Sequence, residues 1–301
     1  MKKIYIRNHA AFAGKWIYEG FYAAWKSRGF LPIYYNTLDE ISGDNYDLMA
    51  IDHDIQTSAH LEVIRRSDRA YLFVQPTSFP KPWGLHPNFI SQMPEQFREE
   101  VNGLPNVHKW SFAKTQEIEY YSEWGDVETV HLAYDSLNYK LEDNSCYEYD
   151  VCYVGGWADN GFNEKRSIIL EHLGKFKNSS LKCAFSVNRG ISHEQENLLL
   201  SRSKVALNIH DAYQRSLGLD LNERTFKGLA LSGILVTDNV RVFSEVFPEI
   251  PTYQSSSEMI DLVGHYCSLP EHELADLRQF NQKKVLENHT YIQRVNQFLN
   301  L

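Results

Sequence analysis

The sequence is poor in the features that mark several large classes of protein. Its four cysteines (Cys146, Cys152, Cys183 and Cys267) form no C-x-x-C pair, so we expect neither metal binding nor redox chemistry from them. No run approaches the ~18 apolar residues of a membrane-spanning helix. The apolar stretch after the first three residues is too short for a signal peptide. These absences predict a cytoplasmic protein without a transmembrane segment.

Positive charge is also scarce, because 30 lysines and arginines stand against 39 acidic residues and give a net charge of −9. Proteins that bind nucleic acid as their main partner need a basic face, so this balance argues against such a partner. The chain also lacks a G-x-G-x-x-G run: neither Gly14 nor the pair Gly155-Gly156 belongs to one. A nicotinamide-dependent dehydrogenase is therefore disfavoured.

What the chain does have is length and aromatic content. At 301 residues it corresponds to about two domains of ~150 residues each. Hydrophobic residues make up 43% and charged residues 23%, which is ordinary for a globular protein. Aromatic residues reach 13%, most of them expected as core filler and some as faces that grip flat or sugar-like ligands.

The first half alternates between strand and helix patterns. Strands are expected at 3–7, 31–35, 46–51 and 70–74, with a helix ending at Gly29 and another around 61–66 between them. Such alternation indicates a parallel sheet with crossover helices. A proline-dense stretch over 76–105 reads as a rim of loops, and short strands at 107–110 and 129–132 close a domain of residues 1–135. Polar residues 136–148 form the expected linker.

The second half repeats the alternation over 149–301. Strands are expected at 149–154, 181–186, 205–210 and 234–237, with helices at 164–173, 194–203 and 224–231 and a helical tail over 257–299. The sequence therefore predicts an α/β protein of two facing Rossmann-like domains. Ligands of such sheets bind beyond the carboxyl ends of the strands, so we expect the active site in the cleft between the domains.

Three stretches of the second half carry a family resemblance. Residues 222–233 read N-E-R-T-F-K-G-L-A-L-S-G and are followed by I-L-V-T-D, residues 149–156 read Y-D-V-C-Y-V-G-G, and residues 289–294 read H-T-Y-I-Q-R. In this order they resemble glycosyltransferases of the GT-B fold, in particular the spore maturation CgeB-like group. The resemblance covers roughly residues 149–301.

The resemblance implies transfer of a sugar from a UDP- or GDP-type nucleotide-diphosphate sugar to an acceptor hydroxyl of a glycan, a lipid-linked or a small molecule. It implies no metal and no other cofactor, because related enzymes hold the diphosphate with basic residues and helix dipoles. The oligomeric state is not predicted. The residues expected to bind the donor are Gly155, Gly156, Lys165, Arg166, Asn188, His210, Asn222, Glu223, Arg224, Thr225 and Asp238.

Physical chemistry supports the same residues as an anion site. A Gly-Gly turn after a strand lets backbone N–H groups approach a diphosphate, and the next helix adds its positive end. Lys165 and Arg166 near that helix start would neutralise charge, and Arg224 at the start of a later helix would stabilise the departing nucleotide. Asn222 also reads as the helix N-cap. His210 is equally well read as a buried structural histidine.

Lys227 departs from the pattern of the resembled enzymes. They commonly place there a glutamate that accepts hydrogen bonds from the ribose hydroxyls, whereas lysine has only donors. Glu223 or Asp220 would then replace that glutamate, or the nucleotide is held differently, or donor binding is lost.

In the first domain the candidates for a general base are His9, Asp52 and Asp54, with His53 between the last two. All follow strands, and an inverting transferase needs a base to take the proton of the acceptor hydroxyl. Asp52-x-Asp54 is spelled like a metal site, but we expect no metal there. Trp83, His86 and Phe89 in the proline-dense stretch are read as a hydrophobic rim that is also able to stack on an acceptor sugar.

Other functions stay open at this point. The departure at Lys227 allows a nucleotide-sugar binding protein without turnover. An isomerase or hydrolase would use the same scaffold. The same transfer to modified phage DNA is a further alternative, against which the acidic balance counts.

Overall fold

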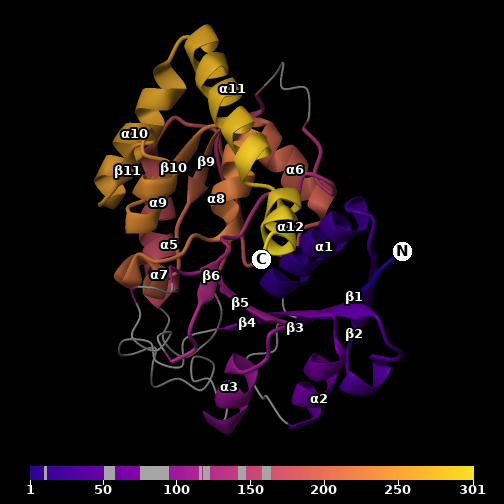
Figure 1. Cartoon of the computed structure of the whole chain (residues 1–301). Coiled ribbons are helices and arrows are strands. Elements are labelled where there is room, and N and C mark those ends of the chain that lie inside the picture. Colours follow the sequence, from indigo (N-terminus) through magenta and orange to yellow (C-terminus); the bar gives the residue numbers. More distant parts are fainter. Residues whose placement is uncertain are drawn as a thin grey trace. The chain divides into compact units, whose positions relative to one another are not determined.

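The computed structural model describes residues 1–9, 12–50, 58–74, 95–114, 117, 123–141, 147–157 and 164–301 (Figure 1). The chain divides into two compact units, one of Met1–His131 with Tyr291–Leu301 and the other of Leu132–Thr290. This division differs from the expected boundaries: the described part of 136–148 groups with the second unit, and the last helix groups with the first. Each unit is built on one sheet.

The first unit has a sheet of six parallel strands. They lie in the order β2 (Leu31–Tyr35), β1 (Lys3–Arg7), β3 (Tyr46–Ala50), β4 (Arg69–Phe73), β5 (Val107–Ser111) and β6 (Val127–Thr129). The expected strands are all found, with β6 placed earlier than 129–132. Parallel pairing without hairpins requires crossovers, and helices or loops supply them.

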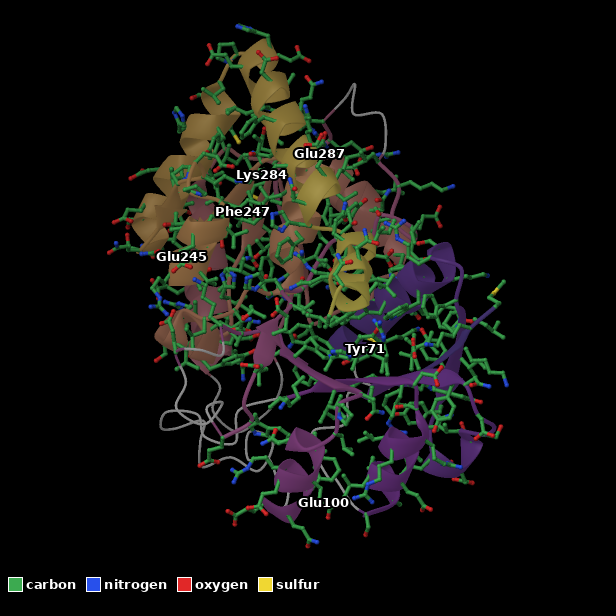
Figure 2. The ribbon with its side chains drawn as sticks, viewed as in Figure 1. Tyr71, Glu100, Glu245, Phe247, Lys284 and Glu287 are labelled. Carbon is green, nitrogen blue, oxygen red and sulfur yellow. The ribbon has the colours of Figure 1, made fainter. Side chains whose placement is uncertain are left out.

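Helices pack on both faces of this sheet. Figure 1 shows α1 (Phe12–Ser27) and α12 (Tyr291–Leu299) on one face and α2 (Ser58–Arg66) and α3 (Glu95–Asn102) on the other. The α12 face is aromatic: the Phe298 ring lies 5.2 Å from that of Tyr71 on β4 and 5.1 Å from that of Trp110 on β5, measured between centroids. Tyr71 is labelled in Figure 2. Helix α12 thus completes the core of the first unit.

The H-T-Y-x-x-R stretch lies where the chain leaves the second unit for α12. In the second unit the backbone N–H of Tyr134 donates to the His289 carbonyl at 2.8 Å, and Tyr134 forms a parallel bridge with Thr290. In the first unit Arg294 Nε donates to the His131 carbonyl at 2.8 Å. The chain therefore passes from one unit to the other twice, after His131 and after Thr290, and within each unit the two neighbouring segments are hydrogen-bonded to each other.

The second unit has a sheet of five parallel strands. They lie in the order β11 (Thr252–Tyr253), β10 (Leu235–Asp238), β9 (Ser203–Asn208), β7 (Tyr149–Gly155) and β8 (Cys183–Val187). Helices α5 (Glu164–Gly174) and α10 (Ser256–Ser268) pack on it through a core that includes Ile169, Met259 and Val263. The four strands expected from the sequence are present, and β11 is added at one edge.

A second group of helices in this unit packs around a π-helical turn at Gly228–Ser232. It continues α8 (Glu223–Lys227), so the helix expected at 224–231 changes its hydrogen bonding halfway. Both α6 (His193–Ser201) and α11 (Glu271–Asn288) pack against this turn. Further along α11, Lys284 extends over the Phe247 ring, 5.1 Å from its centroid (Figure 2). The short helices α7 (Ala212–Leu217) and α9 (Arg241–Val246) follow β9 and β10 and were not expected.

Among the residues that the structure describes, no helix is both long and apolar enough to cross a bilayer.

Close packing of α12 on α1 generates a stability prediction. A Cβ atom added to Gly20 would lie 2.3 Å from Cδ2 of the buried Tyr291 ring. We expect Gly20→Ala to lower the free energy of unfolding by about 1–3 kcal/mol through overpacking. Urea unfolding followed by tryptophan fluorescence measures this, because Trp25, Trp110 and Trp124 are fully buried in the first unit.

Gly264→Ala is the matched control. Gly264 lies within α10 of the second unit, and an added Cβ there would meet nothing within 4 Å. Alanine should stabilise that helix by up to about 1 kcal/mol. Equal effects of the two substitutions would contradict the packing of α12 against Gly20.

Candidate functional site

Polar side chains gather at the carboxyl edge of the second sheet. Because all five strands are parallel, Gly155 at the end of β7, Asn188 after β8, His210 after β9 and Asp238 at the end of β10 share this edge. These four expected donor-binding residues therefore lie at one edge of one sheet.

The Gly155-Gly156 turn is shaped by Asn188. A Cβ atom on Gly156 would lie 1.8 Å from Oδ1 of Asn188, so only glycine fits there. That Oδ1 accepts a hydrogen bond from the backbone N–H of Trp157 at 2.9 Å, and Asn188 itself has a φ of 52°. Asn188 thus closes the turn, a structural role beside the predicted contact with the donor.

Arg224 is anchored to β9 from the first turn of α8. Its Nη2 donates to the Ile209 carbonyl at 3.0 Å and its Nε to Oδ1 of Asn208 at 3.4 Å. The Asn222 side chain caps α8 by accepting from the Thr225 N–H at 3.1 Å, as expected. The remaining nitrogen, Nη1, would lie 2.9 Å from a Cβ atom on Gly155. The guanidinium group therefore borders the glycine turn.

Lys165, from the first turn of α5, is the second cation at this edge. It forms an ion pair with Asp211, and its side chain is only 12% exposed. Burial and the charge of Arg224 lower the pKa of Lys165 to about 8, against the opposing effect of Asp211. Burial acts to raise the pKa of Asp211, but Lys165 and Arg224 outweigh it and hold that pKa below its usual range. Two cations thus share one carboxylate.

Arg166 lies beside Trp157, the residue that follows the glycine turn, and its contact with the donor stays a prediction. It is exposed, and its guanidinium carbon lies 5.6 Å from the centroid of the Trp157 ring. Of the two neighbouring basic residues singled out in the sequence, the structure brings Lys165 rather than Arg166 to Arg224. A helix turns by about 100° per residue, so adjacent side chains cannot face the same point.

His210 belongs to a buried polar network. Its Nδ1 lies 2.7 Å from Oδ1 of Asp238, and its Nε2 lies 3.3 Å from Oγ1 of Thr225. Asp238 also lies 3.4 Å from Nε of Arg215. Burial would raise the pKa of Asp238, but its bonds to His210 lower it overall. His210, Thr225 and Asp238 are thus engaged with one another behind Arg224, and direct contact with a donor sugar stays a prediction.

Asn208 links this network to Arg224, and sequence reasoning missed it. It is fully buried, and its Nδ2 donates to Oγ1 of Thr225 at 3.0 Å and of Thr237 at 3.2 Å. Its Oδ1 is the acceptor for Arg224. An amide in the apolar run 205–209 was the available signal, because a buried amide needs partners for both of its ends.

Lys227 is a buried structural cation. Its Nζ lies 3.1 Å from Oε2 of Glu196 on α6 and 3.2 Å from Oε2 of Glu223, and it sits 4.8 Å from the Tyr139 ring centroid. Burial would lower the pKa of Lys227, but the two carboxylates raise it. The lysine that departs from the resembled pattern is thus matched by Glu196, another residue that the sequence analysis did not single out.

Two carboxylates remain as possible acceptors of ribose hydroxyls. Glu223 is tied to Lys227, while burial and Glu196 raise its pKa. Asp220 accepts a hydrogen bond from Nε2 of Gln214 at 2.9 Å, and burial raises its pKa to about 6. Asp220 lies in the loop between α7 and α8. Unlike Glu223, it forms no ion pair with a lysine or arginine among the described residues.

In the first unit only His9 can be placed among the candidates for a base. It follows β1, and its ring stacks on Tyr18 with centroids 5.6 Å apart. A Cβ atom on Gly14 would lie 2.1 Å from its Nδ1. Asp52, His53, Asp54, Trp83, His86 and Phe89 lie outside the described residues.

Within the described ranges, no three His, Cys, Asp or Glu side chains are grouped so as to hold a metal ion. What the edge offers chemically is a positively charged cradle: two basic side chains, a glycine turn and the N-terminus of α5.

Most of the second unit matches a known protein family. Residues 152–300 match the family described as glycosyl transferase-like. No curated protein sequence matches the chain.

Solved structures resemble the chain over most of its length. T4 phage BGT in complex with its UDP-glucose substrate matches with a TM-score of 0.59 and 12% identity, over 98% of this chain and 97% of that one. An alpha-glucosyltransferase in complex with UDP and a 13-mer DNA gives a TM-score of 0.56 and 10% identity, over 96% of both chains. S. aureus TarM gives 0.52 and 9%, over 87% of this chain and 56% of that one. The likeness establishes the two-domain, Rossmann-like GT-B fold.

The lowered pKa of Lys165 predicts how anion binding depends on pH. Its ammonium group loses its proton as the pH rises through about 8, so attraction to an anion is present below that pH and is lost above it. We expect the affinity for inorganic pyrophosphate to fall above about pH 8, by up to tenfold per pH unit. Isothermal titration calorimetry at several pH values measures this.

Lys165→Arg is the matched variant, because a guanidinium group stays charged throughout this range. Its affinity should be flat across pH 8. If the variant shows the same fall as the natural protein, another group is responsible.

Proposed function

We propose that this chain moves a sugar from a UDP- or GDP-sugar to a hydroxyl of a glycan, a lipid-linked or a small-molecule acceptor, and that residues 152–300, which match the glycosyl transferase-like family, supply the donor site. One observation carries the proposal: Arg224 borders the Gly155-Gly156 turn, and Lys165 forms an ion pair with Asp211, on which the charge of Arg224 also acts. Two basic groups beside glycine backbone suit a diphosphate.

The chemistry follows from where charge develops. As the bond between the sugar and the diphosphate breaks, negative charge grows on the leaving phosphate oxygen, and fixed positive groups stabilise that charge. Arg224 is held to the Ile209 carbonyl at 3.0 Å, so its position does not have to be organised during the reaction. Asp211 offsets one of the two positive charges in the free protein, and we propose that the donor's phosphates take its place.

On the acceptor side, His9, Asp52 and Asp54 stay the proposed bases. A base is needed if the reaction inverts the anomeric carbon, because the acceptor hydroxyl must lose its proton as it attacks. We further propose that the chain belongs to the CgeB-like group. The three sequence motifs at 149–156, 222–238 and 289–294, which occur in the same order as in that group, support this.

A donor panel tests the proposal. Transferases commonly hydrolyse their donor slowly when the acceptor is absent, so we expect release of free sugar from a UDP- or GDP-sugar and not from CMP-sugars. Release is measured by chromatography, in excess EDTA and again with Mn²⁺. We propose that the basic groups replace a metal, so EDTA should leave the rate unchanged. Since one structure of the T4 phage enzyme holds UDP and Mn²⁺, strict dependence on Mn²⁺ is the result that would reject this part.

Two arginine variants control the assay. Arg224→Ala should slow release by roughly 10²-fold or more, the usual cost of removing a group that stabilises the transition state. Arg202→Ala removes an exposed arginine that pairs with Glu148 at the opposite end of β9, and should have no effect. Binding of a nucleotide sugar without any release would instead favour a non-catalytic binding protein.

Modified DNA is the second candidate acceptor. It is favoured by the likeness to T4 phage BGT, described as a DNA-modifying enzyme, which extends over 98% of this chain. The net charge of −9 counts against it.

Transfer of label from the active donor to hydroxymethylated duplex DNA separates the candidates. We expect no label on DNA, because counterion release needs a basic face. Labelled DNA whose yield falls steeply with added salt would make DNA the acceptor.

A further inference from the structure

Tyr153 on β7 carries a buried hydroxyl group without a hydrogen-bond partner. Its side chain is fully buried, and the ring packs in the core of the second unit with Val151, Val205 and Tyr253. The hydroxyl oxygen has no partner among the residues that the structure describes. Such groups are rare in folded proteins, because each loses its bonds to water and gains nothing in return.

The position of this hydroxyl explains why it is left open. A Cβ atom built on Gly155 would lie 2.8 Å from the Tyr153 oxygen and 2.9 Å from Nη1 of Arg224. Both polar atoms therefore lie beside Gly155, next to the space that a side chain on this residue would fill. Nε of Arg224 is bound to Asn208 at the end of β9 and Nη2 to Ile209 just after it, while Nη1 and the Tyr153 hydroxyl flank Gly155.

The hydroxyl is a donor at neutral pH. Burial raises the pKa of Tyr153, and the neighbouring carboxylates Asp211 and Asp238 add to this while Arg224 opposes it. A protonated phenol beside a guanidinium group offers two hydrogen bonds to one acceptor that carries negative charge.

We propose that the Tyr153 hydroxyl donates a hydrogen bond to the donor's diphosphate, on the same phosphate group that Nη1 of Arg224 binds. The inference rests on the proposed function and adds a ligand-binding residue to it. Tyr153 then contributes binding energy only when the nucleotide is present, and it makes the free protein less stable.

Tyr153→Phe tests this through two changes of opposite sign. Removing the hydroxyl should weaken UDP binding about tenfold, the effect of one hydrogen bond to a charged group. The same change should raise the Tm of the free protein by roughly 2–4 °C, because an unsatisfied buried group is gone. Calorimetric titration with UDP, or with GDP if that nucleotide binds more tightly, and differential scanning calorimetry measure both changes.

Tyr253→Phe is the matched control in the same core. The Tyr253 hydroxyl already donates to the Asn208 carbonyl at 3.3 Å, so its loss should lower the Tm. A lowered Tm for Tyr153→Phe, or an unchanged affinity for the nucleoside diphosphate, would overturn the inference, since the hydroxyl would then serve the fold or a buried water.

Inorganic pyrophosphate and uridine locate the contact. Tyr153→Phe should bind pyrophosphate more weakly than the natural protein does, and uridine equally. If the natural protein binds neither UDP, GDP nor pyrophosphate, the proposed donor site itself fails, which is distinct from a site that binds them without help from Tyr153.

Discussion

The tie between Arg224 and strand β9 is the interaction on which the proposed site depends. A long, flexible side chain is held by the Ile209 carbonyl and by the Asn208 amide, so its charge is positioned by the sheet rather than by a loop. Asn208 is in turn held by Thr225 and Thr237, from α8 and β10. Three elements therefore fix one guanidinium group, and the hydrogen bonds behind it leave a single nitrogen facing the glycine turn.

Helix α8 serves two purposes because its faces differ. Arg224 points to the sheet edge, while Lys227 pairs with Glu223, four residues earlier, and with Glu196 of α6. A buried lysine is unfavourable unless it is paired, and here two carboxylates pair with it. The replacement of the glutamate common in the resembled enzymes thus alters the interior of the unit. It leaves the cradle of Arg224 and Lys165 intact. Because Glu223 is tied to Lys227, Asp220 is the carboxylate left to accept hydrogen bonds from the ribose hydroxyls.

Much of the fold was predictable from the sequence because parallel sheets have a simple signature. Apolar strands separated by helical patterns located both sheets, and the ends of those strands located Gly155, Asn188, His210 and Asp238. The cap at Asn222 also followed from local chemistry, since its side chain needs only the N–H three residues later.

What escaped prediction was set by partners far apart in the chain. Glu196 acquires its role from Lys227, 31 residues away, and Asn208 from Arg224 and Thr237. Lys165 and Arg166 could not be ranked without knowing how α5 is rotated against the sheet. The short helices α7 and α9 lack a strong period because six residues make less than two turns.

The closing helix of the chain has a practical meaning for work with fragments. The portion that matches the glycosyl transferase-like family runs to residue 300, yet its last ten residues contribute Tyr291 and Phe298 to the aromatic core of the other unit. A fragment that starts at residue 152 would include α12 without the sheet on which this helix packs. The remaining fragment would have a sheet face that α12 no longer covers. Either fragment, expressed by itself, would expose apolar surface and tend to aggregate. A fragment of the second unit should instead begin at Leu132 and end at Thr290.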